Sequence, residues 1–299
     1  MTTLAVLALA ASAFVHQPRL SVAVRTRGGS TLAIRASDLV VPPQLKPPAA
    51  IYEGVIAAGA AKAAMPASKI FTLGVISGCH IAFGSCLAIM IGGACPGIKE
   101  ANPGLQRIIF GAFGLPFGLL MTLITGAELF TGNTALVTTA VFNGKATQGG
   151  LAKSWFYSYA GNFVGSVLVA YLFAASGVMH KGAIAIASAK VATPWIQAFI
   201  RGVLANWLVC MAVWMASGCS DLVSKAVAIW FPISSFVAMG LEHSVANMAI
   251  IPLGMMMGAP VSMRQFIFGN LVPVTLGNAF AGVFCIALAY TMAFGKTKK

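Results

Sequence analysis

Long runs without a charged side chain constrain the fold of this chain more than any other feature. Only 8% of its 299 residues are Asp, Glu, Lys or Arg, whereas a soluble domain carries about 25%. A bilayer needs about 20 apolar residues for one helix, and the charge-free runs after residue 50 reach that length alone or in pairs. They predict six membrane-spanning helices, near residues 69–92, 108–141, 152–177, 195–217, 225–257 and 266–293. Glu128 interrupts the second of these spans and Glu242 interrupts the fifth.

The remaining charges indicate a membrane protein and exclude other classes. Six spans put both termini on one side of the bilayer, and Lys is somewhat more frequent there, which is typical of a cytoplasmic-type face. The net charge of +13 is scattered through loops without a basic stripe or an aromatic platform, so we expect no nucleic-acid partner. The six cysteines form no CxxC pair and have no His at metal spacing, so we expect no disulfide, metal or cofactor.

The composition of residues 1–50 is typical of a bipartite signal and transit presequence. Residues 4–15 are apolar but too short to span a bilayer, and residues 17–48 are rich in Arg, Ser and Thr with one acid, Asp38. The junction Ala-Ser-Ala-Phe at 11–14 resembles the ASAF motif of presequences in algae with secondary plastids. We therefore expect a six-span domain over residues 51–299 in a plastid envelope. A plain secretory signal or a disordered tail is the alternative.

The two interrupted spans have matching sequences. GAELFTGN at 126–133 and GLEHSVAN at 240–247 share the pattern G-x-E-x-x-x-x-N, and Gly-Asn at 161–162 matches Gly-Asn at 277–278. The chain is therefore interpreted as two copies of a three-span unit, about residues 65–180 and 190–295. Because three is odd, the second copy enters the membrane from the opposite side. The pattern predicts an inverted repeat, in which broken helices meet near the midplane at a substrate site.

Polar residues within the breaks are the candidate site residues. A carboxylate at membrane depth needs partners, and a break frees backbone groups that also need them. We expect four residues to support the breaks: Glu128, Asn133, Glu242 and Asn247. His243 lies in the second break opposite Thr131 of the first, and its imidazole is the side chain most readily protonated near neutral pH. We expect His243 to be functional.

These motifs resemble the formate/nitrite transporter family. The matching segments are GAELFTGNT at 126–134, GNFVGSVL at 161–168, LANWLVCMAVWM at 204–215, GLEHSVANM at 240–248, IPLGM at 251–255 and NLVPVTLGN at 270–278. The resemblance covers about residues 50–295. It implies a homopentamer of aquaporin-like protomers in the lipid bilayer, each with its own pore for small monovalent anions such as nitrite and formate.

The resemblance also implies roles for individual residues. Thr131 and His243 form the central polar pair, Asn206 is a pore asparagine, and Lys190 is a lysine of the vestibule. Six residues match the hydrophobic constrictions: Leu115, Leu119, Leu129, Phe130, Val209 and Phe236. Leu115 stands where some family members carry Phe.

The sequence thus predicts an all-α membrane protein with six transmembrane helices in an aquaporin-like inverted repeat, the second and fifth helices being broken. We expect a channel or transporter that imports nitrite, or formate, into the plastid, because nitrite reduction is a plastid reaction. A bare anion crosses apolar rings only at high cost, so transport is expected to be linked to protons through His243. The alternative is an aquaporin-like channel for neutral solutes, although the paired NPA boxes that mark that class are absent. Clustered catalytic residues are also absent, so we do not expect an enzyme.

Overall fold

The computed structural model of the chain describes residues 21–25, 31–35, 45–179 and 181–295. The chain divides into two compact units, Met1–Gln44 and Leu45–Lys299. Most of the expected presequence, including the ASAF junction, lies outside the described residues.

The first unit contains a two-stranded antiparallel hairpin, which the all-helical expectation did not include. Strand β1 (Ser21–Arg25) pairs with β2 (Thr31–Arg35) so that Val22 lies opposite Ile34. The sequences SVAVR and TLAIR place a branched apolar residue at alternate positions, and this period of two favours a strand over a helix.

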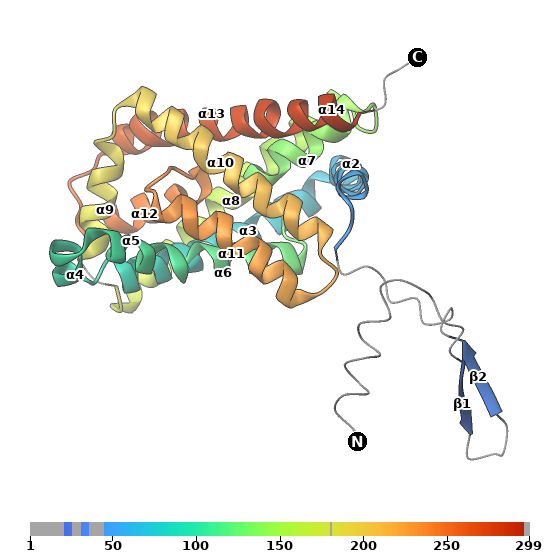
Figure 1. The fold of residues 1–299 in the computed structure, drawn as a ribbon. Helices are drawn as coiled ribbons and strands as arrows, with labels where there is room; N and C mark the ends of the chain where they lie inside the picture. The colour runs from blue at the N-terminus through green and yellow to red at the C-terminus, as the bar shows by residue number, and fades with distance from the viewer. Residues whose placement is uncertain (1–20, 26–30, 36–44, 180, 296–299) are drawn as a thin grey trace, which may run out of the picture. The chain divides into compact units, whose positions relative to one another are not determined.

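The second unit is helical throughout its described part. Its first half contains α2 (Pro48–Ala64), α3 (Ala67–Gly92), α4 (Pro96–Ala101), α5 (Pro103–Ala112), α6 (Leu115–Thr125), α7 (Phe130–Phe142) and α8 (Gln148–Ser176). The rest contains α9 (Gly182–Val191), α10 (Trp195–Gly218), α11 (Leu222–Ala238), α12 (Ser244–Met256), η2 (Gln265–Leu271), α13 (Val272–Phe280), η3 (Ala281–Leu288) and α14 (Ala289–Phe294). The last four segments form one continuous helix with two π-helical stretches (Figure 1).

Five helical stretches in the described residues are long and apolar enough to cross a membrane. They are Ala67–Gly92, Pro103–Thr125, Gln148–Ser176, Trp195–Gly218 and Gln265–Phe294. The predicted fifth span, 225–257, is instead divided between α11 and α12, neither of which has that length alone. The predicted second span begins earlier than expected, at Pro103, and bends between α5 and α6.

Both breaks begin at a glycine in the left-handed backbone region. Gly126 ends α6 and Gly240 follows α11, each with φ of 72°. After each glycine the next amide reaches back five residues, from Ala127 to the Thr122 carbonyl and from Leu241 to the Phe236 carbonyl. This pattern is the Schellman motif, which needs a residue without a Cβ at the left-handed position. The glycines therefore stop the helices where the sequence pattern predicted interruptions.

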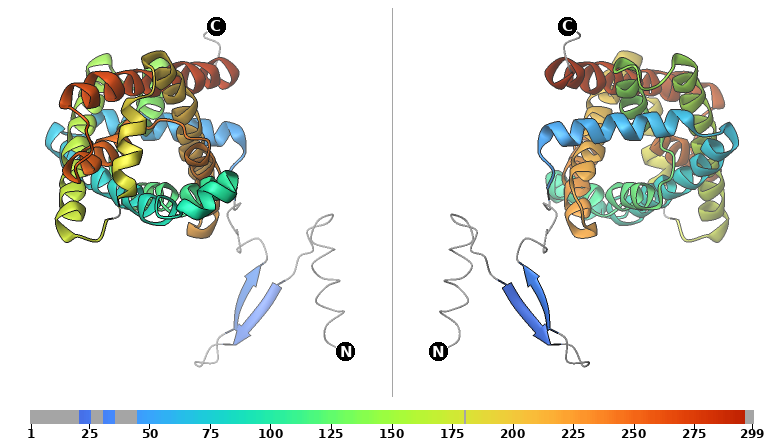
Figure 2. Two further views of the ribbon diagram at one scale, coloured as in Figure 1. Left: turned by 90° about the vertical axis from the view of Figure 1, so that its left-hand side faces the viewer. Right: turned by 90° about the vertical axis from the view of Figure 1, so that its right-hand side faces the viewer.

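Helices α2, α4 and α9 were not predicted. Helix α2 begins at Pro48, inside the range assigned to the presequence. Helix α2 packs against α7, and α9 packs against α12, so each lies on the helix that follows a break. The two lie at opposite ends of the bundle (Figure 2). Because α9 ends in Val191, Lys190 belongs to a helix and not to a loop.

Close glycine contacts hold the long helices together in both halves. A Cβ on Gly165 of α8 would lie 2.0 Å from the Val75 carbonyl oxygen of α3. Likewise, a Cβ on Gly277 of α13 would lie 2.2 Å from the Phe199 carbonyl oxygen of α10. Small residues that allow backbones to approach are the usual means of packing helices in a membrane.

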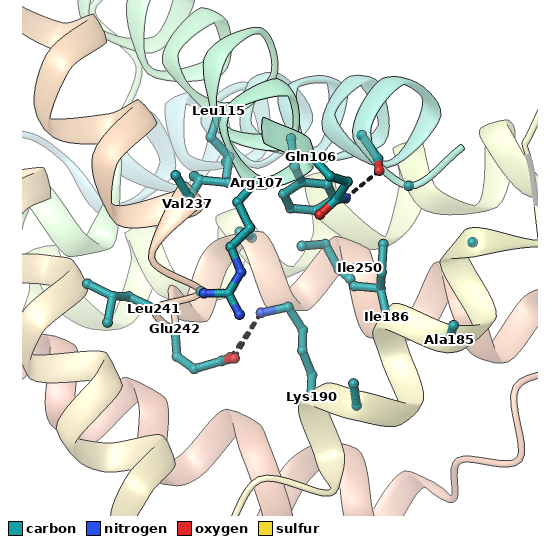
Figure 3. Close-up of a pocket in the computed structure, with 18 of the residues that line it drawn as sticks. Gln106, Arg107, Leu115, Ala185, Ile186, Lys190, Val237, Leu241, Glu242 and Ile250 are labelled. Atoms are coloured by element: carbon teal, nitrogen blue, oxygen red, sulfur yellow. Dashed lines mark hydrogen bonds and ion pairs between the residues drawn. The ribbon is translucent and has the colours of Figure 1, made fainter. Parts of the chain in front are cut away.

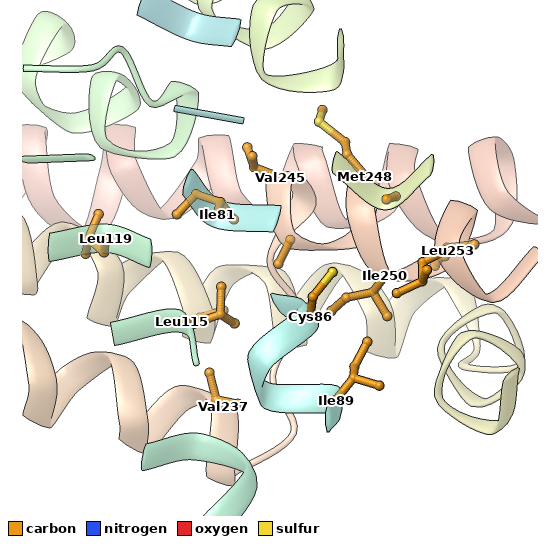
Figure 4. Close-up of a cluster of buried hydrophobic side chains, with 14 of the residues drawn as sticks. Ile81, Cys86, Ile89, Leu115, Leu119, Val237, Val245, Met248, Ile250 and Leu253 are labelled. Carbon is orange, nitrogen blue, oxygen red and sulfur yellow. The ribbon is translucent and has the colours of Figure 1, made fainter. Parts of the chain in front are cut away.

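An apolar cluster fills the space between the long helices and the broken ones. Its members include Ile81, Leu119, Val245, Ile250 and Leu253, and Figure 4 shows them on several helices. This packing fixes the ends of the broken helices, which carry the polar residues described next.

Candidate functional site

Glu128 is the centre of a polar network in the first break. Its side chain is 1% exposed and accepts hydrogen bonds from Lys62 Nζ at 2.5 Å and from Asn133 Nδ2 at 2.7 Å. Its backbone amide donates to the Leu73 carbonyl of α3. A buried carboxylate is tolerated where a cation and further donors surround it, and Lys62 and Asn133 meet that need.

Glu242 has matching partners in the second break. It accepts from Lys190 Nζ at 3.1 Å on both oxygens and from Asn247 Nδ2 at 2.6 Å. Its amide donates to the Arg201 carbonyl of α10. The sequence analysis expected Glu128, Asn133, Glu242 and Asn247 to support the breaks, and the structure brings each Glu together with its Asn.

Two further asparagines, at matching positions of the two networks, received no role from the sequence. Asn162 of α8 donates to the carbonyls of Gly74 and Glu128 and accepts from the Phe130 amide. Asn278 of α13 does the same with Gly202, Glu242 and the Ser244 amide. The repeated Gly-Asn pair was a signal that could have identified them, because a fully buried amide on a packed helix needs several partners.

Lys62 was also missed as a site residue. It lies 66 positions before its partner Glu128 and on a helix that the sequence did not predict. The corresponding Lys190 was expected at a vestibule, where it would attract anions. The structure places Lys190 on the wall of a cavity, as described below, and pairs it with Glu242.

His243 links the two breaks through its two ring nitrogens. Nε2 lies 3.0 Å from Thr131 Oγ1, and Nδ1 accepts a hydrogen bond of 3.0 Å from the Ala246 amide. A backbone N–H only donates, so Nδ1 carries the lone pair and the neutral ring carries its proton on Nε2. His243 is therefore the N-cap of α12 and, at the same time, a hydrogen-bond donor toward Thr131.

Asn206 stands behind this pair. Its Nδ2 donates to the Asn278 carbonyl at 2.6 Å, to Thr134 Oγ1 at 3.1 Å and to the Thr131 carbonyl at 3.3 Å. Asn206 thus ties the start of α7 to α13, and it is fully buried. Its contacts position Thr131, whose hydroxyl faces His243.

A small apolar chamber of about 10 Å³ adjoins His243. Besides His243 it is lined by Ile81, Leu115, Leu119, Leu129, Val209, Ile233 and Phe236. Five of the six residues predicted as constrictions therefore meet at one cavity. Phe130, the sixth, lines neither this chamber nor the larger cavity, because its ring packs edge-on against Trp155 and Tyr159.

A larger cavity of about 450 Å³ reaches His243 from the side of α4, α5 and α9. Leu115, Phe236 and His243 line both cavities and so form the boundary between them. The larger cavity has four cationic residues on its wall, Lys99, Arg107, Lys190 and Arg201, but one carboxylate, Glu242. Figure 3 shows Arg107, Lys190 and Glu242 close together on this wall. A cavity with this excess of positive charge attracts anions.

The fold and the site define a membrane transporter or channel. Its long helices are apolar, its two broken helices are joined by Thr131 and His243, and a cationic cavity ends at this pair. A sequence profile described as "Formate/nitrite transporter" matches residues 49–292. The chain belongs to the formate/nitrite transporter family.

Individual relatives agree with this assignment. The "Probable formate transporter" of Methanothermobacter thermautotrophicus is 38% identical over 272 residues, which cover 84% of this chain and 98% of that protein. The "Formate channel FocA" of Escherichia coli (strain K12) is 33% identical over 272 residues, covering 83% and 94%.

Solved structures are similar as well. One, titled "FNT family ion channel", has a TM-score of 0.75 and 30% identity over 82% of this chain and 98% of that chain. Another, titled "Pentameric formate channel with formate bound", has a TM-score of 0.66 and 28% identity over 77% and 98%. The named relatives are channels and transporters.

Proposed function

We propose that the protein is a channel or transporter for small monovalent anions, with nitrite and formate as the leading substrates. The supporting observation is the position of His243 at the boundary between a cationic cavity and an apolar chamber. The cavity concentrates anions, and the chamber is too apolar to hold a bare charge at low cost. A hydrogen-bond donor is needed where the two meet, and His243 Nε2 supplies it beside Thr131. The formate named in the relatives' descriptions supports this substrate class.

We also propose the six-span inverted repeat, with α6 and α7 as the second span and α11 and α12 as the fifth. The support is that each Glu contacts a lysine, asparagines and a carbonyl acceptor for its amide, within residues 62–162 for Glu128 and within residues 190–278 for Glu242. A homopentamer follows by analogy with the solved pentameric formate channel. The mass of the detergent-solubilised assembly tests this, and a monomeric or dimeric mass would contradict it.

The proposal includes a link between transport and protons through His243. Neutral His243 has its lone pair on Nδ1, where it holds the Ala246 amide. A second proton on the ring would occupy Nδ1, so the imidazolium loses the hydrogen bond from the Ala246 amide. Its Nε2–H group still faces the chamber. Protonation beside the anion makes the pair neutral, and transfer of the Nε2 proton to the anion yields a neutral acid. Both forms cross an apolar chamber at lower cost than the bare anion does.

The decisive experiment measures nitrite, formate and bicarbonate uptake into proteoliposomes between about pH 5 and 8, the range in which an unperturbed imidazole changes charge. His243→Asn is the informative variant, because the Asn side-chain oxygen keeps an acceptor for the α12 cap but does not titrate. We expect the wild type to transport faster as pH falls and the variant to lose this dependence. An unchanged pH profile in His243→Asn would contradict the proton link. Uptake confined to a neutral solute such as glycerol would instead favour the aquaporin-like alternative.

We further propose that residues 1–50 direct the protein to a plastid envelope, so that nitrite import serves reduction inside the organelle. The support is the sequence alone: an apolar core, the Ala-Ser-Ala-Phe junction and an Arg-rich stretch with one acid. A fluorescent protein fused after residue 50 should accumulate in the plastids of an alga with secondary plastids. Its secretion from the cell would indicate a plain signal peptide.

A further inference from the structure

Arg107 occupies the cationic cavity without a partner in the described part of the chain. It extends from α5 toward Lys190 and Glu242 in Figure 3, and the cavity wall includes all three residues. No hydrogen bond or ion pair joins its guanidinium to residues 45–179 or 181–295. An arginine fork that faces a cavity and is unpaired has five donors available to a ligand.

Glu242 is the carboxylate on the cavity wall that could pair with Arg107, but it already binds other residues. Both oxygens of Glu242 bind Lys190, and Oε2 also accepts from Asn247 at 2.6 Å and Asn270 at 3.3 Å. Glu242 offsets the charge of Lys190, so the charges of Arg107, Lys99 and Arg201 have no counterpart on the cavity wall. The cavity wall therefore carries a net positive charge that a bound anion would offset.

The helix that carries Arg107 is held by two neighbouring helices, α3 and α11. The Gln106 side chain donates to the Gly92 carbonyl of α3 at 2.5 Å, and the Trp230 indole of α11 donates to the Ala112 carbonyl at 2.8 Å. A Cβ on Gly111 would lie 2.5 Å from the Ser234 carbonyl oxygen, so α5 also packs against α11 without room for adjustment. This packing fixes the backbone of Arg107, and a fixed backbone lowers the entropy lost when the side chain binds a ligand.

We propose that Arg107 is a specificity-determining residue that captures planar anions with two oxygen atoms, carboxylate or nitrite, in the cavity before they reach His243. The guanidinium presents two parallel N–H groups whose spacing matches two oxygens on one atom. A spherical anion such as chloride engages the charge but not the fork. The ammonium of Lys190 is a point charge and has no such preference. The inference rests on the proposed function and names the substrate class of the same cavity.

Two substitutions separate the charge of Arg107 from its geometry. Arg107→Lys keeps the charge and removes the fork, and Arg107→Gln removes both. Arg264→Gln is the matched control, since Arg264 is exposed and lies outside the cavity wall. Binding is measured on detergent-purified full-length protein by line broadening of ¹³C-formate, with chloride as competitor at constant ionic strength. Uptake of formate and nitrite into proteoliposomes is measured in parallel.

We expect Arg107→Lys to raise the half-saturating formate concentration about tenfold while the inhibition constant of chloride stays within about twofold, because a bidentate charge-assisted contact is lost. Arg107→Gln should weaken chloride about tenfold and formate by more than Arg107→Lys does, because the charge is lost together with the fork, and Arg264→Gln should change neither. A formate affinity unchanged in Arg107→Lys, or an equal loss for both ions, overturns the inference. Formate binding with this pattern but without uptake would leave the inference standing and overturn the proposed function. A matching elution volume in gel filtration shows that a variant is folded.

Discussion

At the scale of single residues, buried charges in this protein occur as paired sets. Glu128 is 1% exposed and Lys62 is 19% exposed, and the two are joined across 66 positions of sequence. Each lies where a lone charge would be costly, yet together with Asn133 they satisfy one another. Removing one member of such a set should therefore lower the free energy of unfolding by more than the pair as a whole contributes to it.

Replacing Lys62 with Met is expected to destabilise the protein by about 3 kcal/mol, since it leaves a buried carboxylate without its cation. The double variant Lys62→Met with Glu128→Gln should recover most of that loss, because the amide carries no charge. Unfolding midpoints in detergent measure both effects. Lys145→Met, at an exposed position, is the control and should have the wild-type midpoint. A double variant less stable than the single one would mean that the ion pair itself, and not the orphaned charge, sets the stability.

At the scale of elements, helix ends determine the site more than helices do. The left-handed glycines stop α6 and α11, and the residues that follow place Thr131 at the start of α7 and His243 before α12. If α6 continued into α7, or α11 into α12, without a break, the side chains of Thr131 and His243 would point in other directions and would not meet.

Gly126→Ala and Gly240→Ala should each destabilise the protein by about 1–2 kcal/mol, because a Cβ is disfavoured at a φ of 72°. Gly149→Ala is the matched control, since Gly149 lies exposed in the first turn of α8 and has no positive φ. Its stability should be unchanged or slightly raised. Thermal unfolding in detergent distinguishes these outcomes, and equal midpoints for all three variants would show that the breaks do not depend on the glycines.

At the scale of the whole molecule, the networks of the two breaks are separate. Glu128 takes its partners from residues before α9, and Glu242 takes its partners from α9 onward. The halves are joined by apolar packing and by hydrogen bonds outside the two networks, among them those of Thr131, Asn206 and His243 and the bond from Trp230 to the Ala112 carbonyl.

A chain cut between Val178 and Met179 should therefore reassemble from two co-expressed fragments, because the cut leaves both networks whole. Co-purification of the fragments through a tag on one of them is the measurement. A cut after Gly144 is the control, since it separates Glu128 from Asn162 and Asn133 from Ser154, and it should abolish assembly. Equal recovery from both cuts would contradict the separation of the networks.

The sequence predicted the breaks because their signals are local. Glu128 and Glu242 interrupt charge-free runs, and a carboxylate at membrane depth is rare enough to stand out. The resemblance to the formate/nitrite transporter family was found in these same local motifs. The ion pairs of Lys62 and Lys190 with these carboxylates could not be predicted from the sequence. They depend on α2 and α9, which are short apolar helices with no distinctive periodicity. Phe130 was expected beside the constriction residues, but its orientation is set by Trp155 and Tyr159 of α8, which local sequence does not reveal. Arg107 lies one residue before the predicted span 108–141 and received no role from the sequence.

The two nitrogens of His243 have an evolutionary consequence. One nitrogen holds the backbone of α12 and the other faces the chamber, so a substitution at this position must satisfy a structural and a chemical requirement together. Side chains that cap a helix well are few, chiefly Asn, Asp, Ser, Thr and Gly, and none of them titrates near neutral pH. Under the proposed coupling of transport to protons, a lineage that gives up this coupling therefore has a short list of replacements for His243, with Asn foremost. A lineage that keeps the proposed coupling needs a side chain that both caps α12 and titrates near neutral pH, and only histidine does both.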